Sequence, residues 1–234
     1  MCVAAAGDAD ETELSRLFQK YFHAWPAEPI LAAPRVQGKK TSIPKKPLLV
    51  PLPGKSSTDV VIGKGLSITK EHPDFYPLIL ASRILGNPGF NGRLMKTVRE
   101  KLGLTYGIYA YLGGFADNEE GNTYVWGTFA PQSLQRGLRA IAKETTLFFK
   151  KGALSGEFSE HKQALLGAYN LSFATSGSFA GALLQILEDG KEISFLDEYA
   201  NRLRSVALAD VNRVIKKYFN PKSAVRVLSG TFSA

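Results

Sequence analysis

The chain has 234 residues, 44% of them hydrophobic and 21% charged, with a formal net charge of +8. This composition is ordinary for a globular protein, and the apolar runs are too short to span a bilayer. The single cysteine, Cys2, excludes an internal disulfide framework and a zinc cluster built from cysteines. The densest group of lysines, at 39–46, lies in a proline-rich stretch. We therefore interpret the positive charge as solvated surface and expect no nucleic-acid partner.

The first 53 residues are expected to hold one helix and a linker. No basic residue precedes Asp8, so we expect no secretory signal peptide at this end. The stretch from Pro26 to Pro53 contains seven prolines, which is typical of an extended linker. The expected elements are a short buried strand at 2–7, a helix at 11–22 capped by Asp8 or Asp10, and a strand at 48–52.

The remainder of the chain mixes strand and helix patterns. Alternating β-branched and aromatic residues predict strands at 58–67, 106–112, 122–129 and 224–228. Apolar residues at helical spacing predict helices at 72–85, 92–101, 134–151, 155–171, 179–188, 195–205 and 210–219. This order indicates an α+β fold with a mostly antiparallel sheet covered by helices. We expect Trp126, Phe129, Phe148, Phe149 and Phe173 in its core.

The three histidines do not form a zinc motif. His23, His72 and His161 each lack a second histidine four residues away. A near match is Glu157-Phe-Ser-Glu160-His161, in which a glutamate stands at the position of the first histidine ligand. A carboxylate can bind zinc, but positions 157 and 161 share one helix face, and we interpret them as a solvent-facing polar pair. We therefore expect no metal site in this chain.

Three segments resemble one peptidase family. The first, from Ala4 to Pro26, looks like the strand, helix and exit that finish a family unit, and the third, from Leu154 to Pro221, looks like the closing helices. The second runs from His72 to Ala110, and its stretch RLMKTVREKLGLTY, from Arg93 to Tyr106, is a close match to a second-unit signature. The chain is thus similar to the pitrilysin, insulysin and mitochondrial-processing-peptidase family of zinc metallopeptidases.

The resemblance implies a processing-peptidase-like metallohydrolase fold and the second, inactive, C-terminal domain of this family. Residues 1–43 would be the tail of a preceding family unit, with its strand and helix, followed by the proline-rich linker. Residues 44–234 would be the second peptidase domain. A tandem repeat of this kind would also account for a strand followed by glycine near both ends of the chain.

The resemblance assigns a substrate-binding role to Arg99 and Tyr106. In the family, an arginine and a tyrosine seven residues apart in the second unit hydrogen-bond the substrate backbone near the scissile bond. Here Arg99 falls near the end of an expected helix and Tyr106 at the start of the next strand, with Gly103 between them. A guanidinium and a phenol aimed at one spot can both donate hydrogen bonds to a developing oxyanion. The alternative is that Arg99 pairs with Glu100 or another neighbour on its helix, and that Tyr106 merely packs.

Two further tyrosines leave two interpretations open. Tyr109 and Tyr111 continue the expected strand after Tyr106. They either line a peptide groove that binds its ligand by strand addition, or belong to a half-buried sheet.

Together these features imply the non-catalytic half of a zinc metallopeptidase, forming a substrate-binding wall. Zinc would be supplied by another domain or subunit, and the chain alone would bind no cofactor and be inactive. The expected partners are an unfolded peptide and a zinc-motif domain or subunit of the same family, in a homo- or heterodimer. The alternative is a structural or peptide-binding subunit without a role in proteolysis, like the core proteins of respiratory complexes. A bacterial cytoplasm or periplasm and a mitochondrion all fit the resemblance.

Overall fold

The computed structural model describes residues 2–25, 44, 46–86, 91–115 and 119–232. Residue contacts divide the chain into two units. The smaller unit comprises Met1–Ser42 and Asn170–Ile193 and contains helices α1 (Glu11–Phe22) and α5 (Ser176–Glu188). The larger unit comprises Ile43–Tyr169 and Ser194–Ala234 and contains the sheet. The boundary at residue 43, between a preceding family unit and a second domain, stays a prediction.

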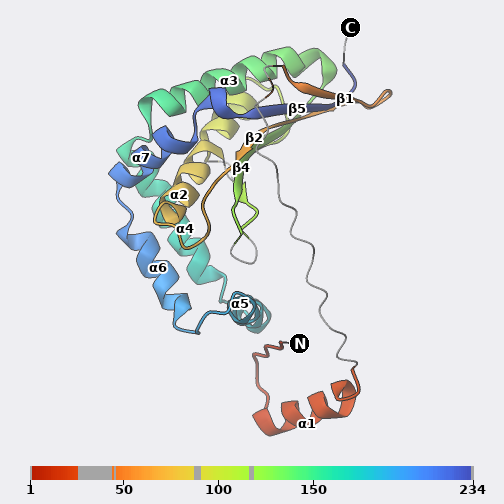
Figure 1. Cartoon of the computed structure of the whole chain (residues 1–234), viewed down its shortest axis with the longest axis vertical. Helices are drawn as coiled ribbons and strands as arrows, with labels where there is room; N and C mark the ends of the chain where they lie inside the picture. Colours follow the sequence, from red (N-terminus) through yellow and green to blue (C-terminus); the bar gives the residue numbers. More distant parts are fainter. Residues whose placement is uncertain (1, 26–43, 45, 87–90, 116–118, 233–234) are drawn as a thin grey trace. The chain divides into compact units, whose positions relative to one another are not determined.

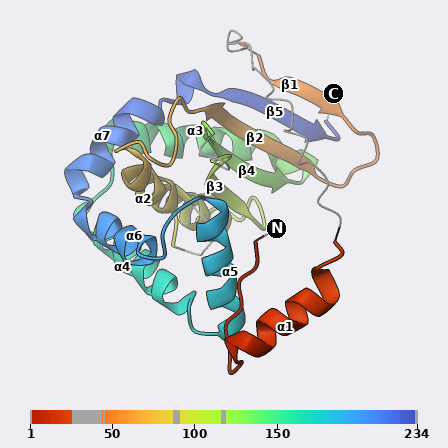
Figure 2. The same ribbon diagram turned by 60° about the horizontal axis from the view of Figure 1, so that its bottom comes forward.

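The larger unit is built on a five-stranded sheet with the strand order β1-β5-β2-β4-β3 (Figure 2). Its strands are β1 (Leu48–Pro51), β2 (Thr58–Gly65), β3 (Ile108–Gly113), β4 (Asn122–Phe129) and β5 (Val225–Gly230). Strand β1 is parallel to β5, and the other neighbours are antiparallel. This arrangement confirms the α+β fold with a mostly antiparallel sheet.

One face of the sheet is buried under helices α2 (Phe75–Gly86), α3 (Leu134–Lys151) and α7 (Leu208–Tyr218), which lie on one side of it (Figure 1). Because strand side chains alternate between faces, every second residue points into this layer. The buried hydrophobic residues that the strands contribute are Val60, Ile108, Ala110, Val125, Phe129 and Leu228. Phe129 and Phe148 therefore lie in the core, as predicted. Phe149 and Phe173, also expected there, are only half-buried, so that part of the prediction is wrong.

The remaining elements complete the helical layer and its connections. They are α4 (Ser155–Leu171), α6 (Phe195–Ser205), the short helix η1 (Met95–Lys101) and the 3-10 turns η3 (Pro131–Ser133) and η4 (Pro221–Ser223). Across the ranges that the structure describes, no helix combines the length and the apolar character that a membrane crossing requires.

The short buried strand expected at residues 2–7 does not form. No described residue pairs with this segment in a strand ladder, and its side chains are exposed or half-buried. A strand is stable only beside a neighbour that completes its backbone hydrogen bonds, and the five strands here all come from residue 48 onward. Helix α1 forms as predicted, and Asp10 caps it by accepting from the Thr12 N–H at 2.8 Å.

The helix expected at 92–101 forms, but its body, η1, is a π-helix. The Leu102 N–H donates to the Thr97 carbonyl, five residues back, at 3.1 Å. The chain is tightly folded just before this helix, because a Cβ atom on Gly92 would lie 2.5 Å from the Cα atom of Gly86. π-Helical turns are rare and often occur at functional sites, so this segment is a natural place to look for one.

A buried aspartate joins α2 to α7. Asp74 is 2% exposed and accepts hydrogen bonds from Lys217 Nζ (2.8 Å), the Tyr218 hydroxyl (2.7 Å) and the Arg213 guanidinium. Burial alone would raise the pKa of Asp74, but the hydrogen bonds from Lys217, Arg213 and Tyr218 together outweigh it. The pKa is therefore held well below its ordinary value, and the ionised carboxylate stabilises the folded state.

We expect Asp74→Asn to lower the free energy of unfolding by about 2 kcal/mol near neutral pH, since hydrogen bonds to a charged group contribute about 1.5–3 kcal/mol. The folded-state pKa is depressed, so this stabilisation is present above the pKa of the unfolded chain, about 4. It is lost as the pH falls toward the folded-state pKa. Urea unfolding of both proteins, from about pH 7 down to about pH 3, measures this difference.

Asp59→Asn is the matched control. Asp59 Oδ2 lies 3.7 Å from Lys55 Nζ in a partly exposed ion pair, and such pairs contribute about 0–1 kcal/mol. Equal losses in the two variants would contradict the role given to Asp74. So would a difference between Asp74→Asn and the unsubstituted protein that does not shrink in acid.

Candidate functional site

One turn between η1 and β3 positions Arg99 and Tyr106. Arg99 lies in the last turn of the π-helix, and Tyr106 stands two residues before β3. Between them Gly103 has a φ of +60°, a left-handed conformation that side chains other than glycine rarely adopt. The Gly103 N–H donates to the Arg99 carbonyl at 2.9 Å and closes the helix. The turn therefore depends on a glycine at this position.

The backbone on both sides of Tyr106 is anchored. Leu104 is buried in the core. The Thr105 hydroxyl donates to the Thr128 carbonyl of β4, and the Gly107 N–H donates back to Thr105 Oγ1 at 3.2 Å. The Tyr106 side chain itself is 85% exposed. A fixed backbone thus presents a large aromatic side chain outward.

The structure brings the two predicted site residues together. The Arg99 Cζ atom lies 5.0 Å from the centroid of the Tyr106 ring, which is within the range of a cation–π contact. The alternative in which Tyr106 merely packs does not agree with its exposure. The role of the pair toward a substrate stays a prediction.

A second arginine attaches the π-helix segment to the helical layer. Arg93 Nε donates to Glu157 Oε1 at 2.8 Å, and Arg93 Nη2 donates to Glu157 Oε2 at 2.7 Å and to the Gly152 carbonyl at 2.8 Å. The guanidinium also lies 5.1 Å from the ring centroid of the buried Phe148. A bidentate arginine–carboxylate pair fixes direction as well as distance. Arg93 therefore holds the start of the segment that ends at Arg99.

These contacts also determine the role of the two glutamates in the near match to a zinc motif. Glu157 accepts from the Leu154 N–H at 3.0 Å as well as from Arg93. Burial would raise the pKa of Glu157, but the Arg93 hydrogen bond and the Leu154 N–H outweigh it and lower that pKa. Glu160 accepts from Asn91 Nδ2 at 2.8 Å. Both carboxylates are thus committed to other groups.

The interpretation of positions 157 and 161 as a solvent-facing pair is wrong. His161 is only 6% exposed, and burial lowers its pKa. The helix face expected to meet solvent instead packs toward η1. Within the described ranges, no three residues among histidine, cysteine, aspartate and glutamate gather as a set of metal ligands. The residues present at 157–161 therefore do not fit zinc.

The other face of the sheet carries four aromatic rings. Tyr109 stacks on Trp126 with ring centroids 6.0 Å apart, and Tyr111 stacks on Tyr124 at 5.1 Å. Each pair faces across β3 and β4 in register. We call Tyr109, Tyr111, Tyr124 and Trp126 the aromatic face. Trp126, expected in the core, is half-buried on this face, because it alternates with the buried Val125.

A groove of about 290 Å³ lies on the sheet beside the aromatic face. It is bordered by Val61, Tyr124, Val225 and Val227, with Gly63 among its lining residues. A Cβ atom on Gly63 would lie 2.4 Å from the Cβ atom of Tyr124, so the close approach of Tyr124 at this border of the groove requires a glycine at 63. Apolar walls around a recess of this kind suit an apolar side chain.

A model of the family described as the peptidase M16 inactive domain matches residues 1–165. The chain belongs to this family. This finding confirms the resemblance to the second, inactive domain of the pitrilysin-type zinc metallopeptidases. The chain is accordingly an inactive M16 domain of a zinc-protease-like protein.

Relatives of this M16 inactive domain are longer than the chain. An uncharacterized zinc protease from Streptomyces coelicolor is 27% identical over 238 residues, which cover 97% of this chain and 50% of the relative. A peptidase M16 inactive domain from Pseudomonas fluorescens has a TM-score of 0.77 and 24% identity, covering 97% of this chain and 52% of that chain. The periplasmic protease PqqL from Escherichia coli has a TM-score of 0.68 and 16% identity, covering 96% of this chain and 24% of that one. The chain spans about half the length of the curated relative.

Sequence reasoning missed the contacts that hold this M16 inactive domain in shape. The Arg93–Glu157 pair joins residues 64 positions apart, and the Asp74–Arg213 bond joins residues 139 positions apart. No local pattern pairs such residues.

The turn between Arg99 and Tyr106 gives a second prediction. Gly103→Ala forces a left-handed residue to carry a Cβ atom, and we expect it to lower the free energy of unfolding by about 1 kcal/mol. Nothing lies within 4 Å of the added atom, so the cost arises from backbone conformation alone. Chemical denaturation of the two proteins measures the change.

Gly167→Ala is the matched control with the opposite sign. Gly167 lies inside α4 on its exposed side, with nothing within 4 Å of an added Cβ atom. Alanine there should raise the free energy of unfolding by about 0.5–1 kcal/mol, because it is the better helix former. A stabilising Gly103→Ala would show that the turn does not need its left-handed residue.

Proposed function

We propose that this M16 inactive domain forms the substrate-binding wall of a zinc metallopeptidase, with Arg99 and Tyr106 hydrogen-bonding the peptide near the scissile bond. The zinc and its activated water belong to another domain or subunit. Two findings support this division of roles. The chain spans about half of a relative named a zinc protease, and Glu157, in the near match to a zinc motif, is committed to Arg93. Alone, the chain is inactive.

The observation that carries the proposal is the contact between the half-buried Arg99 and the exposed Tyr106 on an anchored turn. The Tyr106 ring, 5.0 Å from the Arg99 guanidinium, is too exposed to contribute much to packing of the core. Stacking on a ring uses the face of a guanidinium, while its N–H groups lie in the guanidinium plane. A phenol hydroxyl adds one donor. The pair therefore suits a carbonyl oxygen that gains negative charge.

The neighbouring strand supports an extended peptide as the substrate. The pair directly precedes β3, which is an edge strand of the sheet. An edge strand offers a row of backbone donors and acceptors to which an extended peptide can add. Alternate side chains of such a peptide would lie beside Tyr109 and Tyr111 of the aromatic face, which β3 carries. Of the two interpretations of Tyr109 and Tyr111, we favour the peptide groove.

The test measures cleavage of a fluorogenic peptide by the chain combined with a zinc-bearing M16 domain. We expect Arg99→Gln to lower kcat/KM by about 100-fold, in line with the loss of one oxyanion donor. Tyr106→Phe removes a single hydroxyl, and we expect a loss of about tenfold or more. Tyr106 is exposed, Arg99 is half-buried and neither belongs to the core, so the free energy of unfolding should change little.

Matched controls separate this role from a general change of charge or surface. Arg136→Gln removes an exposed arginine of α3, and Tyr21→Phe removes an exposed tyrosine hydroxyl of α1. Both should leave kcat/KM unchanged. If Arg99→Gln and Tyr106→Phe behave like these controls, the proposed roles are wrong. Peptide binding without any effect on cleavage would favour a structural or peptide-binding subunit.

A further inference from the structure

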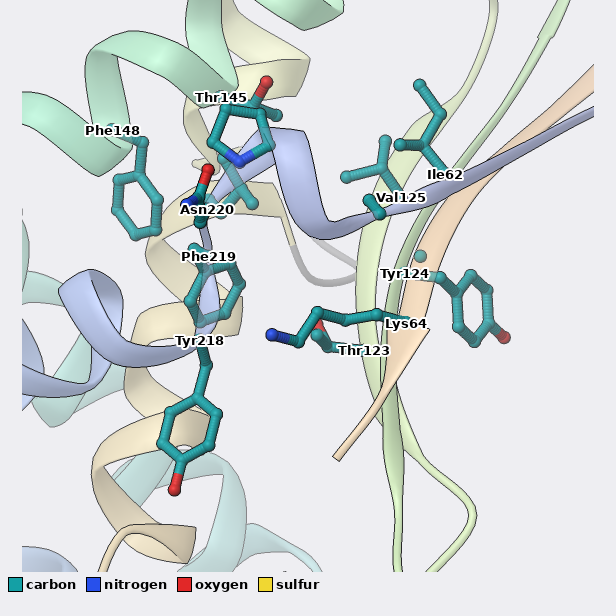
Figure 3. Close-up of a pocket in the computed structure, with 14 residues that line it drawn as sticks. Ile62, Lys64, Thr123, Tyr124, Val125, Thr145, Phe148, Tyr218, Phe219 and Asn220 are labelled. Atoms are coloured by element: carbon teal, nitrogen blue, oxygen red, sulfur yellow. The ribbon is translucent and has the colours of Figure 1, made fainter. Parts of the chain in front are cut away.

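A pocket opens on the helix-covered side of the sheet, between β2, β4 and the segment that follows α7 (Figure 3). Its cavity volume is about 60 Å³. The apolar walls include Ile62, Leu85, Val125, Phe148 and Phe219. Leu85 and Phe148 are core residues, so the pocket leads from the surface into the hydrophobic core.

One cation extends into this apolar space. Lys64 stands two residues after Ile62 on β2, and its side chain extends from the strand toward Tyr218 and Phe219 (Figure 3). The ammonium donates one long hydrogen bond, 3.4 Å, to Ser223 Oγ. Burial lowers the pKa of Lys64, because the charged amine has lost part of its hydration. An ammonium in such a place is more stable when an anion accompanies it.

Among the described residues, no carboxylate pairs with Lys64. A second donor stands on the pocket wall at Asn220. Its Oδ1 accepts from the Lys222 N–H at 3.0 Å, which leaves its Nδ2 group to serve as the donor. The Tyr218 hydroxyl donates to Asp74, so Tyr218 contributes only its ring. The pocket thus combines an apolar interior with cationic and amide donors, and no acid.

We propose that this pocket binds a short aliphatic carboxylate. The anion would contact Lys64 Nζ and Asn220 Nδ2, and the alkyl group would pack against Ile62, Leu85 and Val125. The volume of the cavity limits the length of the alkyl group. For comparison, an apolar cavity of about 150 Å³ takes up benzene. The present cavity of about 60 Å³ is less than half as large, so it holds only a short alkyl group of a few carbons.

Two sources share this chemistry. One is a free branched-chain acid, and the other is a leucine or valine at the C-terminus of a peptide. The pocket opens on the opposite face of the sheet from the aromatic face and does not include Arg99 or Tyr106. It shares Gly63, Lys64, Thr123 and Tyr124 with the lining of the groove, because these strand residues border both faces. The inference therefore does not rest on the proposed function, and each can fail without the other.

The test is a titration of the isotope-labelled chain followed by amide NMR signals. Isovalerate should produce saturable shifts at Thr123, Phe219 and Asn220. Isovaleramide has the same shape without the charge, and it should bind at least about tenfold more weakly, because a charge-assisted hydrogen bond is about twice as strong as a neutral one. This comparison needs no substitution, so it stays decisive if a variant fails to fold. Equal binding of the two compounds would overturn the proposal.

Two lysine variants locate the charge that matters. Lys64→Met keeps the length of the side chain, and it should abolish the preference for isovalerate. Lys222→Met removes an exposed lysine from the adjoining turn η4, and it should keep that preference. The proposal is wrong if Lys64→Met still prefers the acid, or if the shifts map to another region.

Acetyl-leucine and acetyl-leucinamide distinguish the two sources. Tighter binding of acetyl-leucine than of isovalerate assigns the pocket to the C-terminus of a peptide. Tighter binding of isovalerate assigns it to a free acid. Failure of both carboxylates to bind would overturn the proposal for either source.

Discussion

Successive side chains along the strands of the larger unit point to opposite faces of the sheet. This alternation separates two surfaces of different chemistry. Val60 and Lys64 point toward the helices, whereas the neighbouring Val61 points to the other face. Val61 is in register with Trp126, and Trp126 with Tyr109. A slip of one residue would exchange the faces, placing the lysine among aromatic rings and the rings under the helices. Register therefore specifies both the core and the open face.

Arg93 connects this core to the segment that carries the candidate site. Its guanidinium lies over the ring of Phe148 and binds Glu157, whose side chain is 26% exposed, while that of Arg93 is 13% exposed. A pair this buried adds little net stability, because desolvation offsets much of the attraction. Its value here lies in geometry. It fixes one end of η1, and the turn at Gly103 fixes the other, so Arg99 is held between two restrained points.

Much of the fold could be predicted from the sequence, because strand and helix periods are local properties. The errors have identifiable physical causes. Trp126 and Phe129 are three residues apart on one strand, so alternation alone places them on opposite faces, and hydrophobicity was wrongly given more weight. The segment at 2–7 is as apolar as a strand, but no strand among the described residues pairs with it. Helical spacing does not distinguish a π-helix from an α-helix, and Asp74 and Glu157 meet partners far along the chain. The family resemblance implies the Arg99–Tyr106 pair, and the proximity of the two residues could be predicted because both belong to one short segment.

Charge is distributed unevenly between the two faces of the sheet. By alternation, Asp59 is the one charged residue that the strands direct to the open face within the described residues, and Lys55 lies 3.7 Å from it. The net charge of +8 therefore resides elsewhere on the chain. A peptide on this face would bind through its backbone and apolar side chains, with little selection by charge. Under the proposed function, this is the property expected of a wall that accepts many unfolded sequences, and directional recognition would come from the donors of Arg99 and Tyr106.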